Sequence, residues 1–128
     1  MGNEDRRKYP RVQIFDPISY LTLDSDGKTI YQNVAVVRNV SQTGIQMEAF
    51  LEVKYKKLSL MFFDMYKNQI EVKGKVIYCR RNESGQFSIG IHLIGNEAEN
   101  LRFVKALVKS YHYQKEKSRL VISPEILN

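Results

Sequence analysis

The sequence predicts an all-β domain, an antiparallel barrel or sandwich of short strands, followed by one C-terminal α-helix. From residue 12 to residue 94, short apolar segments, several with a period of two, are separated by turn-forming residues. After residue 95 the apolar side chains are spaced as on one face of a helix. The 128 residues, 43% hydrophobic and 27% charged, suit a single globular domain.

We divide this domain into four consecutive parts. Residues 1–11 form a basic arm that is too polar to bury itself, and we expect this arm to be flexible. Residues 12–95 form the β region, and residues 96–117 form the helix. The tail, residues 118–128, contains enough apolar side chains to dock, but the sequence does not indicate where.

Three strands are expected in the first half of the β region, at residues 12–23, 29–39 and 45–51. They are rich in β-branched and aromatic residues, which favour strands. Pro17 lies within the first of them and marks an edge or a bulge, because proline lacks the N–H that a central strand donates. An Asp-Ser-Asp-Gly turn at residues 24–27 separates the first two strands.

Three more strands are expected at residues 58–66, 70–78 and 87–93. The first is almost continuously apolar, and the second alternates, with Ile70 and Tyr78 on the same face. Gly74 and Gly90 lie inside strands, where a missing side chain permits the sharp bends that close a barrel.

The helix is expected to begin at Gly95 or Asn96, either of which can cap it. Its apolar face should consist of Leu101, Val104, Val108 and Tyr111, widened by Phe103 and Leu107. One helix packed on or across a small barrel is the simplest arrangement of these parts.

Charge and cysteine content limit the class of protein. An excess of 20 Lys and Arg over 14 Asp and Glu gives a net charge of +6, which favours an anionic partner without choosing between nucleotide, nucleic acid and membrane. A single cysteine, Cys79, excludes an internal disulfide framework and fits a reducing cytoplasm. No apolar run approaches the about 20 residues of a spanning helix, so we expect a cytoplasmic protein without membrane insertion.

The sequence offers little for catalysis. We find no nucleophile and base at a recognisable spacing and no glycine-rich phosphate loop. His92, His112 and Cys79 are too scattered to predict a metal site. We therefore expect neither enzymatic activity nor a cofactor nor a bound metal.

A basic cluster, Arg-Arg-Lys-Tyr-Pro-Arg at residues 6–11, lies directly before the first strand. Pro10 favours an extended conformation at Tyr9, so we do not expect the cluster to be part of a helix. Each guanidinium presents a planar fork of donors that matches phosphate oxygens or the O6/N7 edge of guanine. On an extended segment, Arg7 and Arg11 can hold a small dianion between them; the alternative is a basic tail that is merely solvated.

A polar segment, Asn-Val-Ser-Gln-Thr-Gly at residues 39–44, ends one strand and begins the next. Short polar side chains at such a turn usually form hydrogen bonds with nearby backbone groups. On its own, the segment therefore predicts only a turn. Gly44 fits either a positive φ or a close approach of another backbone.

Together the two segments resemble the PilZ domain, a bacterial receptor module for cyclic di-GMP. An RxxxR motif, here residues 7–11, precedes an [D/N]xSxxG motif, here residues 39–44, and Ile-Gly-Ile-His-Leu at residues 89–93 is similar to the closing strand of that family. The resemblance covers roughly residues 6 to 113. It implies a six-stranded antiparallel β-barrel plus one α-helix, and cyclic di-GMP as ligand.

The resemblance also implies a role for individual residues. Arg7 and Arg11 would hold phosphates and guanine edges, and Asn39 and Ser41 would hydrogen-bond a guanine. Arg6 resembles the additional arginine of members that bind the ligand as a stacked dimer. The full set of implied ligand-binding residues is Arg6, Arg7, Arg11, Asn39, Ser41 and Gly44.

The resemblance implies a signalling role, in which ligand binding orders the arm and an unidentified effector protein reads the change. Two alternatives remain open. One is a PilZ-like module that acts through protein contacts and does not bind nucleotide. The other is a basic barrel for single-stranded nucleic acid, whose residues would be Arg80, Arg81, Lys54, Lys56, Lys57 and Tyr55.

Overall fold

The computed structural model describes residues 11–121. Arg6 and Arg7, and the tail beyond residue 121, lie outside the described residues. The elements are β1 (Val12–Leu23), β2 (Thr29–Val40), β3 (Gly44–Ala49), β4 (Lys57–Phe63), β5 (Gln69–Arg81), β6 (Phe87–Leu93) and α1 (Glu97–Val121).

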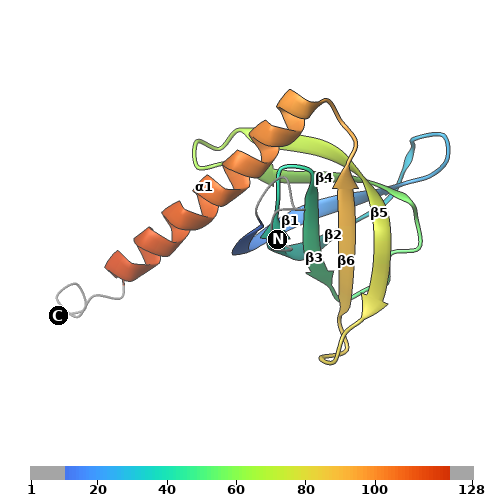
Figure 1. Ribbon diagram of the computed structural model, residues 1–128, viewed down its shortest axis with the longest axis horizontal. Helices are drawn as coiled ribbons and strands as arrows, with labels where there is room; N and C mark the ends of the chain where they lie inside the picture. The colour runs from blue at the N-terminus through green and yellow to red at the C-terminus, as the bar shows by residue number, and fades with distance from the viewer. Residues whose placement is uncertain (1–10, 122–128) are drawn as a thin grey trace, which may run out of the picture.

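The six strands form one closed antiparallel barrel in the order β1-β2-β3-β6-β5-β4 (Figure 1). Closure comes from β1, which pairs with β2 along one side and with β4 along the other. A closed barrel has no strand with an unpaired side, so the expected barrel is confirmed and the sandwich is wrong. A bulge lies between Gln13 and Asp16, directly before Pro17. Of the two expectations for this proline, an edge or a bulge, the bulge is correct.

The core lies inside the barrel and beneath the helix. Val37, Met47, Leu60 and Ile89 have no exposed surface, and they come from four different strands. Because side chains alternate along a strand, the residues between them point outward and are free to build a surface site.

Two features of β4 and β5 differ from the sequence prediction. The strand β4 ends at Phe63, because Asp64 Oδ1 accepts hydrogen bonds from the N–H groups of Tyr66 (2.9 Å) and Asn68 (2.8 Å) and fixes a turn there. A bulge between Val76 and Tyr78 then changes the face of β5. Tyr78 therefore lies on the outside of the barrel rather than beside Ile70.

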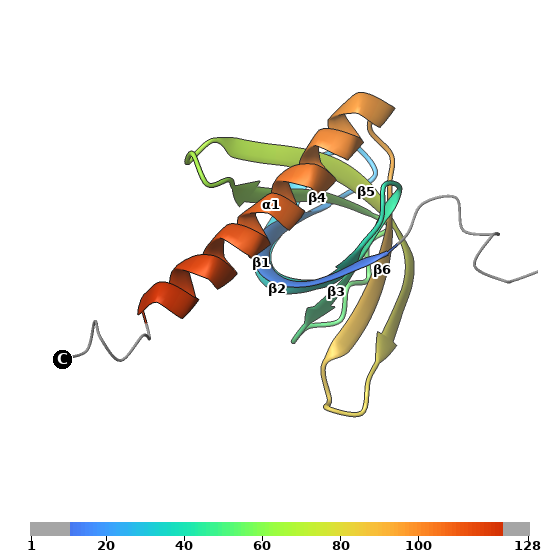
Figure 2. The same ribbon diagram turned by 60° about the vertical axis from the view of Figure 1, so that its left-hand side comes forward.

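The helix begins where its cap predicts and ends later than expected. Asn96 Oδ1 accepts a hydrogen bond from the Glu99 N–H at 2.8 Å, as an N-cap residue does. The helix continues to Val121, four residues beyond the expected end at Lys117. Two views show α1 across one side of the barrel, with its C-terminal half extending past the strands (Figures 1 and 2).

The face that α1 buries is rotated from the predicted one. Phe103 and Leu107, expected at its margin, are fully buried at its centre, and the Phe103 ring packs edge-on against Phe62 with centroids 5.2 Å apart. Leu101 and Val108, expected at the centre, are only partly buried. The barrel surface is narrower than the apolar face of the helix, so part of that face remains outside the core.

Candidate ligand-binding site

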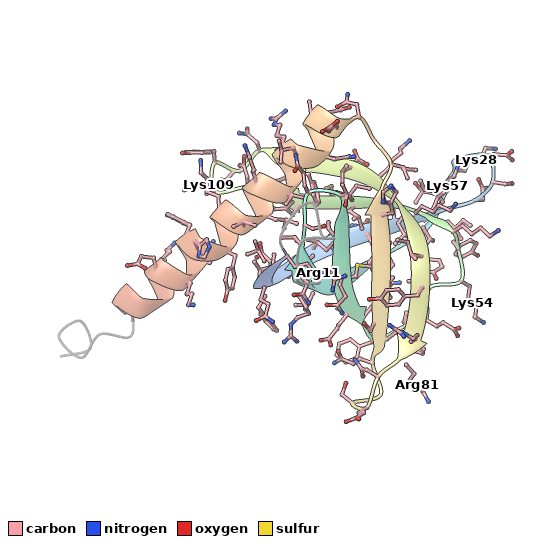
Figure 3. The ribbon with its side chains drawn as sticks, viewed as in Figure 1. Arg11, Lys28, Lys54, Lys57, Arg81 and Lys109 are labelled. Carbon is pink, nitrogen blue, oxygen red and sulfur yellow. The ribbon has the colours of Figure 1, made fainter. Side chains whose placement is uncertain are left out.

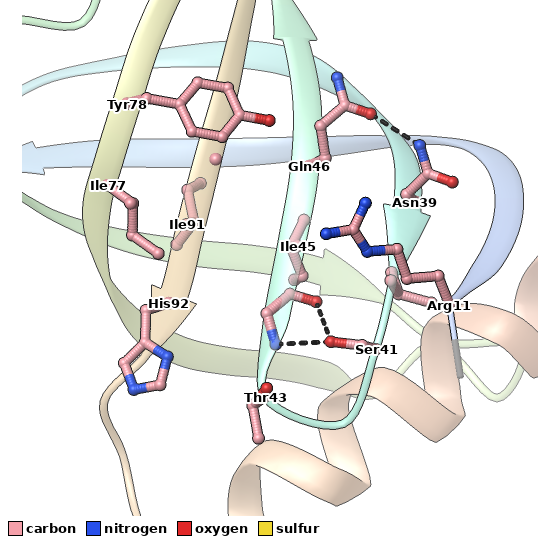
Figure 4. Close-up of a pocket in the computed structure, with 13 residues that line it drawn as sticks. Arg11, Asn39, Ser41, Thr43, Ile45, Gln46, Ile77, Tyr78, Ile91 and His92 are labelled. Carbon is pink, nitrogen blue, oxygen red and sulfur yellow. Dashed lines mark hydrogen bonds between the residues drawn. The ribbon is translucent and has the colours of Figure 1, made fainter. Parts of the chain in front are cut away.

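A pocket of about 420 Å³ lies on the outer wall of the barrel, over β2, β3, β6 and β5 (Figure 4). Its volume is within the usual range for small-molecule sites. The pocket is lined by Arg11, Asn39, Val40, Ser41, Thr43, Gly44, Ile45, Gln46, Ile77, Tyr78, Gly90, Ile91 and His92. Four of the six residues expected to bind a ligand are in this set.

The strand register builds the floor of the pocket. Asn39 pairs with Gln46, Gln46 pairs with Gly90, and Gly90 pairs with Tyr78. Directly paired residues point to the same face of a sheet, so these four residues form one row across the outer wall. No pattern in the sequence connects them, because each comes from a different strand.

Hydrogen bonds fix the two amides in this row. Asn39 Nδ2 donates to Gln46 Oε1, and Gln46 Nε2 donates to Ser88 Oγ, each at 2.9 Å. Within residues 11–117, no hydrogen bond uses Asn39 Oδ1, which leaves this oxygen free to accept from an N–H of a ligand. The chain of amides thus presents an oriented acceptor at the edge of the pocket.

The turn from Ser41 to Gly44 is held by its own polar groups. Ser41 N donates to Gly44 O at 2.9 Å, and Gly44 N donates to Ser41 Oγ at 3.2 Å. A Cβ on Gly44 would lie 3.0 Å from the carbonyl oxygen of Ile91, and its φ is not in the left-handed region. Of the two reasons expected for this glycine, the close approach of another backbone is the correct one.

Arg11 reaches the pocket because of where β1 begins. Val12 pairs with Val40, so the residue before Val12 lies beside the end of β2. The Arg11 side chain is exposed and extends toward Asn39 and Gln46 (Figure 4). None of the described ion pairs involves it.

Tyr78 forms the opposite wall of the pocket and was not expected there. Its ring occupies the space that a side chain at Gly90 would take, since a Cβ on Gly90 would lie 2.1 Å from Tyr78 Cε2. The guanidinium of Arg80 lies 4.4 Å from the centre of the same ring. The glycine inside β6 is expected from the sequence to permit a bend that closes the barrel; the structure shows that the missing side chain also makes room for the Tyr78 ring.

The lining is suited to an anion. No Asp or Glu is among the described residues that line it. The nearby carboxylate of Glu48 is paired with Arg38 at 2.9 Å and therefore does not oppose Arg11. An anionic ligand would meet arginine, amide and hydroxyl groups, which together can hold phosphates and a polar ring.

Comparison with known proteins identifies the family. The model of the PilZ domain matches residues 5–110, most of the chain. This chain belongs to the PilZ family. No curated protein matches it.

Solved PilZ structures share the barrel. The Bacillus subtilis inhibitor of motility (MotI/DgrA) matches with a TM-score of 0.59 and 16% identity, over 88% of this chain and 52% of that chain. The PilZ domain of Escherichia coli YcgR, solved with c-di-GMP, matches with a TM-score of 0.54 and 12% identity, over 89% and 98%. K. pneumonia MrkH, also solved with c-di-GMP, gives 0.54 and 14%, over 88% and 54%. At these identities the likeness shows the fold, and the chain spans about half the length of MotI and MrkH.

The remaining cations of this PilZ chain are dispersed. In Figure 3, Lys57 lies near Lys28 on one side of the barrel, and Lys54 lies well below them on the same side. Arg81 lies at the lower end of the barrel, and Lys109 lies on the helix. Tyr55 packs edge-on against Tyr31, with centroids 6.1 Å apart, and is partly buried. A groove for single-stranded nucleic acid combines a continuous basic track with free aromatic faces. The cations labelled in Figure 3, all from the described part of the chain, do not form one such track.

Two further features of the described residues bear on function. They contain no group of three or more His, Cys, Asp or Glu side chains that could hold a metal ion. Along residues 11–121, no helix is both long and apolar enough to cross a membrane.

Proposed function

We propose that this PilZ chain is a receptor for cyclic di-GMP that transmits ligand binding to a partner protein without catalysing a reaction. One observation carries the proposal: Arg11 and five residues between Asn39 and Gly44, distant in sequence, line one pocket to which the described residues contribute no acidic side chain. Family membership and the two ligand-bound PilZ structures support the choice of ligand.

The chemistry of the pocket matches the two halves of the ligand. Cyclic di-GMP carries two phosphates and two guanines. Arg11, together with Arg7, would donate paired hydrogen bonds to phosphate oxygens or to a guanine O6/N7 edge. Asn39 Oδ1 and Ser41 would contact the Watson–Crick edge of a guanine, where N1–H and N2–H₂ donate. Arg6 would add contacts if two stacked ligand molecules bind.

Ligand binding would also change the surface of the protein. A ligand held by both Arg7 and Arg11 fixes the intervening residues against the outer wall of the barrel. A partner that contacts this wall would then meet a different surface in the bound state. A switch requires such a difference, because the partner has to bind one state more tightly than the other.

The proposal is tested by calorimetric titration of the full chain with cyclic di-GMP. Replacing Arg11 by Ala, or Arg7 by Ala, should reduce the affinity by about tenfold to a hundredfold, since each removes charge-assisted hydrogen bonds worth about 1.5–3 kcal/mol. Arg81→Ala is the matched control, because it removes the same charge outside the pocket and should change the affinity by less than about twofold.

Cyclic di-AMP provides a control for base recognition. Adenine lacks the N1–H and N2–H₂ donors, so it would leave the acceptors of Asn39 and Ser41 unpaired and should bind far more weakly. Unchanged affinity in both arginine variants would reject the site. Absence of binding at high micromolar ligand in a folded sample would favour the alternative of a PilZ-like module that acts only through protein contacts.

A further inference from the structure

A second concave surface lies on the other side of the turn between β2 and β3. It is a groove of about 960 Å³ between α1, the turn that connects β4 to β5, and the strand ends at Val12 and Val40. Two views show that turn lying beside α1 (Figures 1 and 2). The apolar side chains that line the groove include Val12, Met65, Tyr66, Leu101, Val104 and Val108.

The groove is apolar because α1 carries more apolar side chains than the core covers. Phe103 and Leu107 are turned into the core, which leaves Leu101 and Val108 facing the groove and only partly buried. Tyr66, on the opposite wall, is 71% exposed. Apolar side chains that converge on a concave surface are typical of a site for another molecule.

The rim of the groove is basic. Arg102, Lys105 and Lys109 lie along one edge and are exposed. Asp64 is the acidic residue among those that line the groove, and its Oδ1 is already engaged by two backbone N–H groups of its own turn. The groove therefore favours an occupant that brings apolar side chains to its centre and carboxylates to its edge.

We propose that this groove is the docking site for an acidic, amphipathic segment of a partner protein. The residues of α1 that line it run from Ala98 to Lys109, a rise of about 16 Å. This length fits a partner helix of about three turns, with apolar residues at positions i, i+3 or i+4, and i+7 in the groove. Glu or Asp beside those positions would meet the basic rim.

Charge argues against two other occupants, the arm of this chain and a second copy of the chain. Residues 1–10 carry Glu4 and Asp5 against three cationic side chains, so the arm of this chain would bring net positive charge to a positive rim. A second copy of the chain has a net charge of +6 and meets the same repulsion. A lipid surface could supply negative charge, but it is flat and would not fill a concave groove.

The groove adjoins the pocket proposed for cyclic di-GMP. Val40 and Ser41 line both, and Val12, which lines the groove, directly follows Arg11, which lines the pocket. A partner in the groove would therefore contact the same turn that shapes the pocket. The docking itself does not depend on nucleotide and is tested without it.

The test selects random 16-residue peptides for binding to the full chain in the absence of nucleotide. The strongest peptide is then titrated by fluorescence anisotropy against the wild type and the variants. We expect the selected peptides to be amphipathic and acidic. The double variant Lys105→Glu and Lys109→Glu should weaken binding by about tenfold or more, because two attractive contacts become repulsive. Lys117→Glu, on the same helix outside the groove, is the matched control and should change binding by less than about twofold.

Several outcomes would overturn the proposal. One is that no peptide is enriched, or that the enriched peptides are basic or bind equally well to the double variant. Another is that peptides bind only after deletion of residues 1–10, which would make the arm the occupant. Sedimentation showing self-association that Val108→Glu abolishes would assign the groove to a second copy. Binding to phosphatidylglycerol vesicles that Val108→Glu abolishes, without peptide binding, would assign it to a membrane.

Discussion

Replacing Gly90 by Ala tests whether the wall of the pocket depends on the missing side chain. A Cβ at this position would lie 2.1 Å from Tyr78 Cε2 and 2.6 Å from Cδ2, whereas ordinary contacts begin near 3.4 Å. The tyrosine ring therefore has to move outward by about 1.3 Å. The Arg80 guanidinium, 4.4 Å from the ring centre, has to move with it.

The size of the effect follows from two opposing terms. Overpacking of this kind costs about 1–3 kcal/mol. Alanine is better than glycine inside a strand by roughly 0.5–1 kcal/mol, because it loses less backbone entropy on folding. We therefore expect Gly90→Ala to lower the free energy of unfolding by about 1–2 kcal/mol, which shifts the urea midpoint down by roughly 1 M for a typical m-value.

A double-mutant cycle isolates the contact with the ring. In a Tyr78→Ala background the space above residue 90 is empty, so Gly90→Ala should be neutral or should stabilise the protein by up to about 1 kcal/mol. The sign of the effect thus reverses between the two backgrounds. Urea denaturation followed by circular dichroism measures all four proteins. An equal loss of stability in both backgrounds would show that Tyr78 does not fill the space above Gly90, and the description of the pocket wall would be wrong.

Three further predictions concern the core, the buried carboxyl and the ligand. Phe103→Ala should lower the free energy of unfolding by about 3–5 kcal/mol, because Phe103 has no exposed surface and packs on Phe62; a smaller loss by urea denaturation would mean that the helix contributes little to the core. Burial raises the pKa of Asp16 to about 6, and its Oδ2 has no hydrogen-bond partner among the described residues. The protonated form is favoured in the folded state, so the contribution of Asp16 to stability is fully present below pH 4 and is lost, by up to about 3 kcal/mol, as the pH rises through 6. Asp16→Asn should remove this dependence, and an unchanged pH profile of the urea midpoint would contradict the assignment. Asn39→Asp should strengthen binding of cyclic di-GMP several-fold in calorimetry, because a carboxylate accepts charge-assisted hydrogen bonds from guanine; weaker binding would show that Asn39 acts as a donor.

The sequence was sufficient where local chemistry determines structure. Apolar, β-branched and aromatic segments between turn-forming residues located all six strands, and some of these segments also alternate because one face of the strand is buried. The cap at Asn96 could be predicted because its side chain accepts a hydrogen bond from a backbone N–H only three residues away. The two short motifs indicated the family, and the family match over residues 5–110 confirms it.

Tertiary structure decided which residues share a surface. The row from Asn39 through Gln46 and Gly90 to Tyr78 depends on strand register and on the bulge before Tyr78, and each residue comes from a different strand. The helix likewise had an apolar face wider than one partner surface could cover. Local patterns determine which elements form and roughly which of their faces are apolar, but the packing of distant segments determines which side chains are fully buried and what they contact.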